Sequence, residues 1–247
     1  MYNPSQTHAV IATLKNVTKR YGEEKIMSRS ITKFALAGLT IGTTISFAVS
    51  ASAAPPAQTH ATVASVAPAG TVLIGNFEGK TTVNKQYGTL VINHSPEFGW
   101  GWSVTTDQRA GGNSVAEIAL IHPGAAGTKG ALRITGEIKP GFPYGPWAGA
   151  IWFPGHEPMQ PAELSGKKEL IFWARGKAGS YNLMLMSGSP GGIPLYASFV
   201  TTPKWKEYHI PLAASFPNAD WKQVYFLAFS AANQGKFQFD LDQVSLH

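Results

Sequence analysis

The amino-acid sequence predicts an all-β domain, a jelly-roll β-sandwich of about ten strands. Apolar and polar residues alternate in short runs, as they do in strands that bury one face. Turn residues are abundant, with 26 Gly and 17 Pro among 247 residues. After residue 71 no apolar pattern with helical spacing continues for three turns, and only residues 162–164 and 213–216 suggest single helical turns. Short strands joined by tight turns are typical of a β-sandwich.

Residues 27–53 have the three parts of a secretory signal peptide. A positively charged start is followed by an apolar, uncharged run and by Ala51-Ser52-Ala53, which fits a cleavage site. The apolar run is short for a membrane-spanning helix, although an uncleaved anchor is the alternative. We therefore expect an exported protein, periplasmic or secreted, with no stable membrane insertion after cleavage.

The chain divides into four predicted regions. Because Met27 begins a complete signal peptide, residues 1–26 are interpreted as a mis-assigned start or an extended signal segment. Residues 54–70 are rich in Ala, Pro and Thr, and we expect a disordered linker there. The folded domain is expected at residues 71–247, a length sufficient for one core.

Ten segments of the domain carry strand patterns. They are residues 71–77, 113–121, 129–138, 146–153, 169–175, 181–186, 193–200, 205–212, 223–230 and 236–246. The segments 181–186 and 223–229 are apolar on both faces, so one face must pack in the core and the other needs a cover or a ligand. In the last segment the apolar positions change parity, which predicts a bulge at Asp242-Gln243.

Composition excludes several classes of protein. The chain has a formal net charge of +6, but after residue 53 it carries 14 Lys/Arg against 12 Asp/Glu. A nearly neutral domain without a basic stripe argues against nucleic-acid binding. The absence of cysteine excludes disulfides, thiolate metal sites and a cysteine nucleophile. No required cofactor is expected.

The stretch GWGWSVTTDQRAGGNS, residues 99–114, is the strongest candidate for a site. Trp100 and Trp102 are two residues apart, so on a strand both would project from one face. Asp107 and Arg109 follow as an acid and a base in the same loop. Gly111-Gly112 then allow a turn or a close approach of the backbone. A structural hairpin with two core tryptophans is the alternative.

Aromatic residues near loops favour carbohydrate binding, because sugars stack their C–H faces on flat rings and pair their hydroxyls with polar groups. The segment KPGFPYGP, residues 139–146, holds two aromatic residues in a stiff backbone. The predicted ligand-binding residues from this pattern are Trp100, Trp102, Asp107, Arg109, Tyr144, Trp147 and Trp152. The alternative is that these rings cap the ends of the sandwich.

Catalytic motifs are missing from the sequence: there is no G-x-S-x-G elbow, no H-E-x-x-H motif and no glycine-rich nucleotide loop. A hydrolase with two converging acids is therefore the less favoured interpretation. Glu78 on the first strand and Asp242 at the bulge could meet if the terminal strands pair, which would suit a structural Ca²⁺. Two simple solvated acids are the alternative.

The segment WSVTTDQRAGGNS, residues 102–114, resembles the tryptophan, aspartate and Gly-Gly-x-Ser signature of the complex I intermediate-associated protein family. Later blocks occur in the same order, among them GALRITGEI, PAELSGKKELIFWARG and FQFDLDQVSL, so the similarity covers about residues 72–247. The resemblance implies a galactose-binding-like jelly roll, related to glucan-binding carbohydrate-binding modules, without known catalytic machinery.

By position, the resemblance identifies a signature loop made of Asp107, Gly111, Gly112 and Ser114, with Arg175 as a polar ligand partner. Gln108-Arg109-Ala110 departs from the family pattern, which weakens any transfer of partner specificity. The sequence therefore predicts an exported, non-catalytic protein that binds carbohydrate through an aromatic-lined face. The alternative is a periplasmic protein-interaction or assembly factor that uses the same face.

Overall fold

The computed structural model describes residues 65–78, 81–84, 89–92 and 98–247. The signal peptide, the segment before it and most of the predicted linker lie outside these residues. Within the described part, no helix is long and apolar enough to cross a membrane. The described strands form two sheets, which confirms the predicted β-sandwich.

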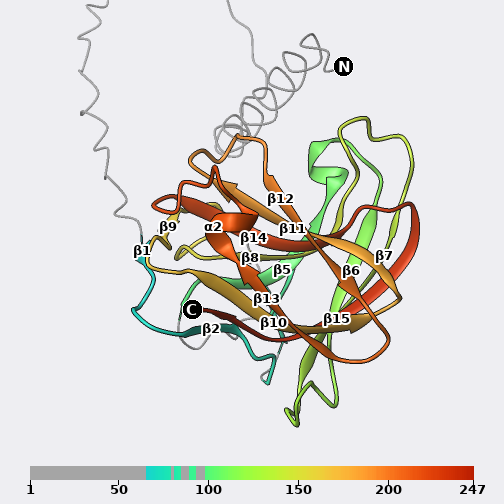
Figure 1. The fold of residues 1–247 in the computed structure, drawn as a ribbon. Helices are drawn as coiled ribbons and strands as arrows, with labels where there is room; N and C mark the ends of the chain where they lie inside the picture. The colour runs from blue at the N-terminus through green and yellow to red at the C-terminus, as the bar shows by residue number, and fades with distance from the viewer. Residues whose placement is uncertain (1–64, 79–80, 85–88, 93–97) are drawn as a thin grey trace, which may run out of the picture.

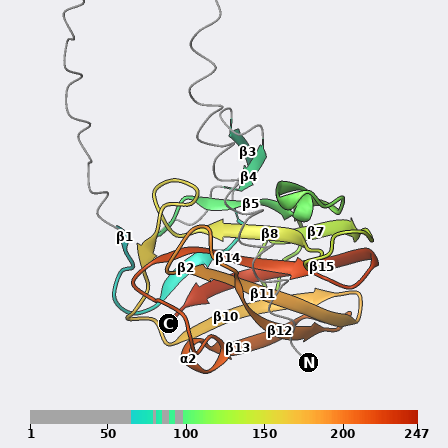
Figure 2. The ribbon, with the colours of Figure 1, turned by 90° about the horizontal axis from the view of Figure 1, so that it is seen from above.

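Sheet A has nine described strands. Six of them follow one another as β12-β11-β14-β8-β5-β4, an order that can be followed from the bottom to the top of the view in Figure 2. Strand β3 extends this path, while β9 pairs with β14 and β1 pairs with β9. The bounds are β1 Ser65–Val66, β3 Thr81–Asn84, β4 Thr89–Ile92, β5 Gly101–Thr106, β8 Ala148–Phe153, β9 Ala162–Glu163, β11 Gly179–Ser187, β12 Leu195–Thr201 and β14 Val224–Ala231.

Sheet B has six described strands, in the order β13-β10-β15-β7-β6, with β2 also paired to β15. In Figure 1, β6 and β7 lie at the opposite side of the sandwich from β1 and β9. The bounds are β2 Val72–Gly75, β6 Val115–Ile121, β7 Ala131–Ile138, β10 Glu169–Gly176, β13 Lys206–Pro211 and β15 Gly235–Leu246. Two single turns, η1 (Asp107–Ala110) and α2 (Leu212–Ser215), complete the described elements.

The main core lies between the two sheets and is dominated by aromatic rings. Phe172 of β10 stacks on Tyr208 of β13, with ring centroids 5.1 Å apart, and meets Phe229 of β14 edge to face at 5.0 Å. Such edge-to-face and offset contacts are the favoured aromatic geometries. The two sheets are therefore joined by interlocking rings contributed from both inner faces.

The predicted bulge in the last strand is confirmed. The residues of β15 that pair with Ile171 and Trp173 are Ser245 and Asp242, so β15 holds one extra residue. Gln243 has a φ of 47°, a left-handed conformation. The extra residue lets both halves of β15 turn their apolar side chains into the core.

Two predicted boundaries need correction. Residues 162–163 form strand β9 and not a helical turn, because they pair with β14 and β1. The linker does not extend to residue 70, since β1 joins sheet A there. The buried Lys167 ammonium donates to the carbonyl oxygens of Pro68 and Gly70, at 2.6 and 2.5 Å. The predicted turn near residues 213–216 is confirmed as α2.

Candidate functional site

A second apolar cluster lies on the face of sheet A that points away from sheet B. We call this set the outer cluster. It comprises Ile151, Phe153, Met184, Met186, Tyr225, Phe226 and Ala228, all buried, with Trp100 and Trp147 packed at its margin. This finding confirms that the strands predicted to be apolar on both faces bury both of them.

Strand register explains why these side chains meet. Met184 lies opposite Ala228, and Ala228 lies opposite Ile151, so one row crosses β11, β14 and β8. The pairing of β11 with β14 shifts register beside Tyr225. A bulge places two neighbouring residues against one on the partner strand, and here Tyr225 and Phe226 both join the outer cluster.

Two tryptophans mark the ends of the outer cluster. Trp100 meets Phe153 edge to face, with ring centroids 5.7 Å apart. Trp147 lies just before β8, and its indole N–H donates to Thr105 Oγ1 at 3.2 Å. Positions 147 and 153 are six residues apart on one face of an extended chain, or about 20 Å. Both tryptophan rings are partly exposed.

The proline-rich loop extends the aromatic surface beyond Trp147. Phe142 contacts Trp147 and Tyr144 edge to face, with centroid separations of 5.7 and 5.6 Å. Tyr144 is 45% exposed. The structure therefore brings the predicted residues Tyr144 and Trp147 together, through Phe142.

Polar groups accompany the apolar row. Ser103 and Thr105 of β5 lie opposite Ile151 and Gly149 of β8. Asn182 of β11 is half-buried and lies opposite Ser230. Ser103, Thr105 and Ser230 are buried, whereas Asn182 is half-buried and Tyr196, opposite Met184, is 50% exposed. An amide and a hydroxyl therefore reach the surface of this face beside the aromatic rings, a combination that suits a ligand with both apolar patches and hydroxyls.

Strands β5, β8, β11, β12 and β14 contain no Asp, Glu, Lys, Arg or His. The five strands are consecutive neighbours in sheet A. The outer face that they share is therefore uncharged along their full length, which disfavours ligands that need an ion pair for recognition.

The prediction that Trp102 and Trp152 contact a ligand is wrong. Both rings are fully buried between the sheets, and the Trp102 indole N–H donates to the Ile74 carbonyl at 2.6 Å. Trp100 and Trp102 do not share a face, because Gly101 between them has a φ of 124°, far from an extended strand. One ring therefore enters the core while the other reaches the outer cluster.

Asp107 is also a structural residue, contrary to its predicted role as a ligand contact. Its side chain is 0% exposed, and its two carboxylate oxygens accept hydrogen bonds from the Ser114 backbone N–H (2.8 Å) and hydroxyl (2.6 Å). Gly111 follows η1 with a φ of 95°, and a Cβ on Gly112 would lie 2.3 Å from the Asp107 carboxyl carbon. The signature loop therefore closes around a buried carboxylate, while Arg109 stays exposed.

Arg175 lies on sheet B and not beside the aromatic residues of the outer cluster. Its guanidinium donates to the buried Asp240 at 2.8 Å and stacks 4.5 Å above the Trp205 ring. Arg133 on β7, the strand on the other side of β15, donates to the same carboxylate at 2.9 Å. The hydrogen bond that Arg133 donates to Asp240 raises the pKa of Arg133 above its ordinary value. The predicted pairing of Arg175 with the tryptophan surface is therefore wrong.

Asp242 is buried at the bulge of β15, beside the hairpin that joins β6 to β7, whereas η1 lies at the other end of β6. Its carboxylate accepts hydrogen bonds from Ala125 N (2.7 Å), Thr128 Oγ1 (2.5 Å) and Gln243 N (2.7 Å). Burial raises the pKa of Asp242, and the nearby Glu78 charge adds to this shift, while the three hydrogen bonds oppose it.

The predicted approach of Glu78 to Asp242 is confirmed, because β2 pairs with β15. Glu78 Oε1 accepts hydrogen bonds from the backbone N–H groups of Lys129 and Gly130, at 2.8 and 3.2 Å. A calcium site normally needs six to eight oxygen ligands. The described residues contain no group of three or more acidic or histidine side chains placed for a metal. A calcium ion at this place stays a prediction, and the N–H groups that already donate to the two carboxylates would compete with it for their oxygen atoms.

The raised pKa of Asp242 predicts a pH-dependent contribution to stability. The folded state favours protonated Asp242, so this contribution is full below about pH 4, the ordinary aspartate pKa, and is lost as pH rises through the folded pKa. We expect Asp242→Asn to gain melting temperature relative to the natural protein between pH 4 and pH 8. A difference in melting temperature that stays constant with pH would contradict this expectation.

A calcium-dependent rise in melting temperature at pH 8, absent from Asp242→Asn, would instead support a metal site.

Comparison with known proteins gives a likeness only to solved structures, since no protein-family model and no curated protein matches the chain. A family 11 carbohydrate-binding module from Clostridium thermocellum, in complex with a beta-1,3-1,4-mixed-linked tetrasaccharide, is 16% identical, with a TM-score of 0.50. The alignment covers 73% of this chain and 96% of that one. The family 30 module of a cellulosomal cellulase of the same organism is 14% identical over 72% of this chain and 96% of that chain, with a TM-score of 0.45.

The shared feature is the jelly-roll fold. At these identities the comparison does not extend to the residues of a site. No family model that matches the chain supports the resemblance to the complex I intermediate-associated protein family.

Sequence reasoning missed several residues of the outer face, among them Phe153, Tyr225, Tyr196 and Thr105. Tyr196 of β12 lies opposite Met184 and is 50% exposed. The available signal was the lack of charge in every one of the five strands, which predicts two covered faces. The pairing partners of these strands could not be predicted, because they are distant in sequence.

Proposed function

We propose that this chain is an exported, non-catalytic protein that binds a neutral carbohydrate along the outer face of sheet A. The observation that carries the proposal is the position of Trp100 and Trp147, two partly exposed rings at opposite ends of a row of outward-facing residues on β8. Sugar rings stack on aromatic faces through their C–H groups. Positions 147 and 153 of this row are about 20 Å apart along the backbone, and such a length suits a linear oligosaccharide better than a single sugar.

The chemistry of the face supports a neutral glycan. Asn182 is half-buried and Tyr196 is 50% exposed on this face, so an amide and a hydroxyl reach its surface, and the five strands of the face carry no charge. A uronic acid or sulfated sugar would find no cationic partner on these strands. The fold adds support, since the similar family 11 module is described in complex with a mixed-linked tetrasaccharide.

Export is the second part of the proposal and rests on the signal-peptide pattern at residues 27–53. Cleavage after Ala53 would leave a mature chain that begins at Ala54. The N-terminal residue of protein recovered outside the cytoplasm, determined by mass spectrometry, tests this part. Recovery of an uncleaved chain in membranes would contradict it.

The central test of function is Trp147→Ala, with binding to soluble neutral β-glucans measured by titration calorimetry. We expect the dissociation constant to rise about tenfold or more, because an aromatic anchor at the end of the face is lost. Trp100→Ala should have a similar effect at the other end. Tyr144→Ala should weaken binding less, since this ring lies outside the outer cluster.

The matched control is Trp205→Ala, which removes a partly exposed tryptophan from sheet B. The melting temperatures of Trp205→Ala and Trp147→Ala, compared with that of the natural protein, show whether either variant is destabilised. Equal losses of binding in both variants would argue against the outer face as the site. If no glycan binds the folded natural protein, capture of a defined envelope protein that is lost in Trp147→Ala would favour the protein-interaction alternative.

A further inference from the structure

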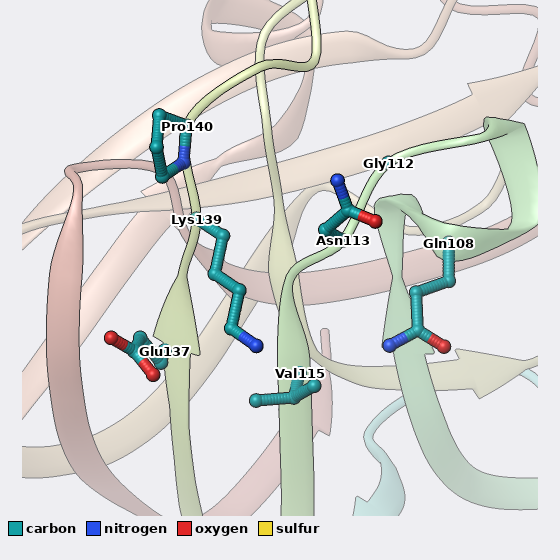
Figure 3. A pocket seen from close by; sticks show the side chains of 7 residues that line it. All are labelled: Gln108, Gly112, Asn113, Val115, Glu137, Lys139 and Pro140. Carbon is teal, nitrogen blue, oxygen red and sulfur yellow. The ribbon is translucent and has the colours of Figure 1, made fainter.

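An open pocket lies at the end of the sandwich next to η1, on the outer side of sheet B (Figure 3). Val115 of β6 and Glu137 of β7 are paired opposite each other in its wall. The remaining lining residues come from η1, from the Gly-Gly turn and from the end of β7. They are Gln108, Gly112, Asn113, Lys139 and Pro140.

A single buried residue, Ser114, ties the segments of this pocket together. The Gln108 side-chain amide donates to the Ser114 carbonyl at 2.9 Å, and the Lys139 backbone N–H donates to the Ser114 hydroxyl at 3.1 Å. Ser114 is in turn held by the buried Asp107 carboxylate. The pocket is therefore fixed before a ligand arrives, which reduces the entropic cost of binding.

The lining offers both hydrogen-bond donors and acceptors. Gln108 keeps its amide oxygen available, and Asn113 contributes a second amide. In Figure 3 the Lys139 ammonium points into the space between Glu137 on one side and the two amides on the other. Neither Glu137 nor Lys139 has an ion-pair partner within 4.0 Å among the described residues.

The charges of the pocket indicate a neutral ligand. One carboxylate and one ammonium cancel, and an anionic group drawn to Lys139 would be repelled by Glu137. Hydroxyl groups can use both, because each hydroxyl donates one hydrogen bond and accepts others. Charge-assisted bonds of this kind are the stronger ones that a neutral polyol can form.

The pocket is connected to the outer face of sheet A by the proline-rich loop. Lys139 and Pro140 begin this loop in the pocket, Tyr144 lies exposed in the middle, and Trp147 ends it at the outer cluster. The Asp107 backbone N–H also donates to the Trp147 carbonyl at 2.9 Å, next to Gln108. In Figure 1, η1 (green) and this loop (yellow-green) lie side by side at the upper right.

We propose that this pocket is a second carbohydrate contact, which binds a hydroxyl-rich neutral sugar residue of a chain that extends past Trp147 from the outer face. The inference rests on the proposed function and adds a distinct set of residues to it. Long chains use both places, whereas an oligosaccharide no longer than the face between Trp100 and Trp147 uses only the outer face.

The test combines the double variant Glu137→Gln/Lys139→Met with two ligands, a β-glucan tetrasaccharide and the long polysaccharide. We expect affinity for the polysaccharide to fall about tenfold, the equivalent of one charge-assisted hydrogen bond. Affinity for the tetrasaccharide should change less than about twofold. The matched control, Glu207→Gln/Lys204→Met, removes the same charges from exposed positions at the other edge of sheet B.

The outcomes separate this inference from the proposed function. Unchanged affinity for both ligands, or equal loss for both with an unchanged melting temperature, would overturn the pocket as a separate contact. If Gln108→Ala in the same assay also weakens only the long ligand, the pocket is supported by a second residue. If Trp147→Ala loses tetrasaccharide binding while the pocket variants keep all their affinity, the outer face is supported as the binding site and the pocket is rejected as a second contact.

Discussion

Trp102→Ala is expected to lower the free energy of unfolding by about 3–5 kcal/mol, as for other large core truncations. The ring is fully buried, and its centroid lies 5.5 Å from that of Phe77 and 5.8 Å from that of Phe229. Truncation would open a cavity and leave the Ile74 carbonyl without its indole donor. Urea denaturation of the purified protein measures this loss.

The control for this experiment is Trp100→Ala, because Trp100 is only partly buried at the margin of the outer cluster. We expect Trp100→Ala to lose less unfolding free energy than Trp102→Ala. We expect Trp100→Ala to lose more ligand affinity than the folded fraction of Trp102→Ala. A Trp102→Ala protein that keeps its unfolding free energy within about 1 kcal/mol would show that the ring is not a core residue.

Asp107→Ala is expected to cost about 3 kcal/mol of stability. The change leaves the Ser114 backbone N–H and hydroxyl without their acceptor in a buried place. Arg109→Ala is the matched control, since Arg109 belongs to the same turn but is exposed. Its effect should stay within about 0.5 kcal/mol, as for other surface substitutions.

A double-mutant cycle with Ser114→Ala identifies the origin of the Asp107 effect. If the two side chains act through their mutual hydrogen bonds, the combined variant should lose clearly less than the sum of the single losses. Strictly additive losses would contradict the role of Asp107 as the acceptor for Ser114. Because Gln108 and Lys139 are tied to Ser114, Asp107→Ala should also weaken binding to the long polysaccharide.

The fold was predictable because strand periodicity is a local property. The alternation in residues 131–138 and the change of parity at Asp242 both correspond to observed features, the strand β7 and the bulge of β15. Strand β5 is not among the ten predicted segments, although the spacing of Trp100 and Trp102 allows for a strand there. The short strand β9 was not predicted, because two residues are too few to show an alternation of apolar and polar positions. Only its pairing with β1 and β14 identifies it as a strand.

The site was harder to predict because it depends on which face each side chain takes. The spacing of Trp100 and Trp102 predicts that both side chains lie on one face of a strand. The positive φ of Gly101 turns the backbone between them, so the two side chains lie on opposite faces. Asp107 in the signature loop is predicted to contact a ligand, but its carboxylate is buried against Gly112, where a Cβ would collide with it. This contact explains the need for glycine at position 112. Arg175 and Trp147 are in different sheets, a separation that the sequence does not reveal.

Strand β15 occupies the centre of sheet B, between β10 and β7, and also pairs with β2. Sheet B therefore cannot be completed until β15 has been synthesised, because β2, near the start of the domain, must pair with this last strand. Folding dominated by such distant pairings is slow. Under the export proposed above, a chain that stays unfolded until its last strand emerges would suit passage through a translocation channel, and it would complete its sandwich only on the far side.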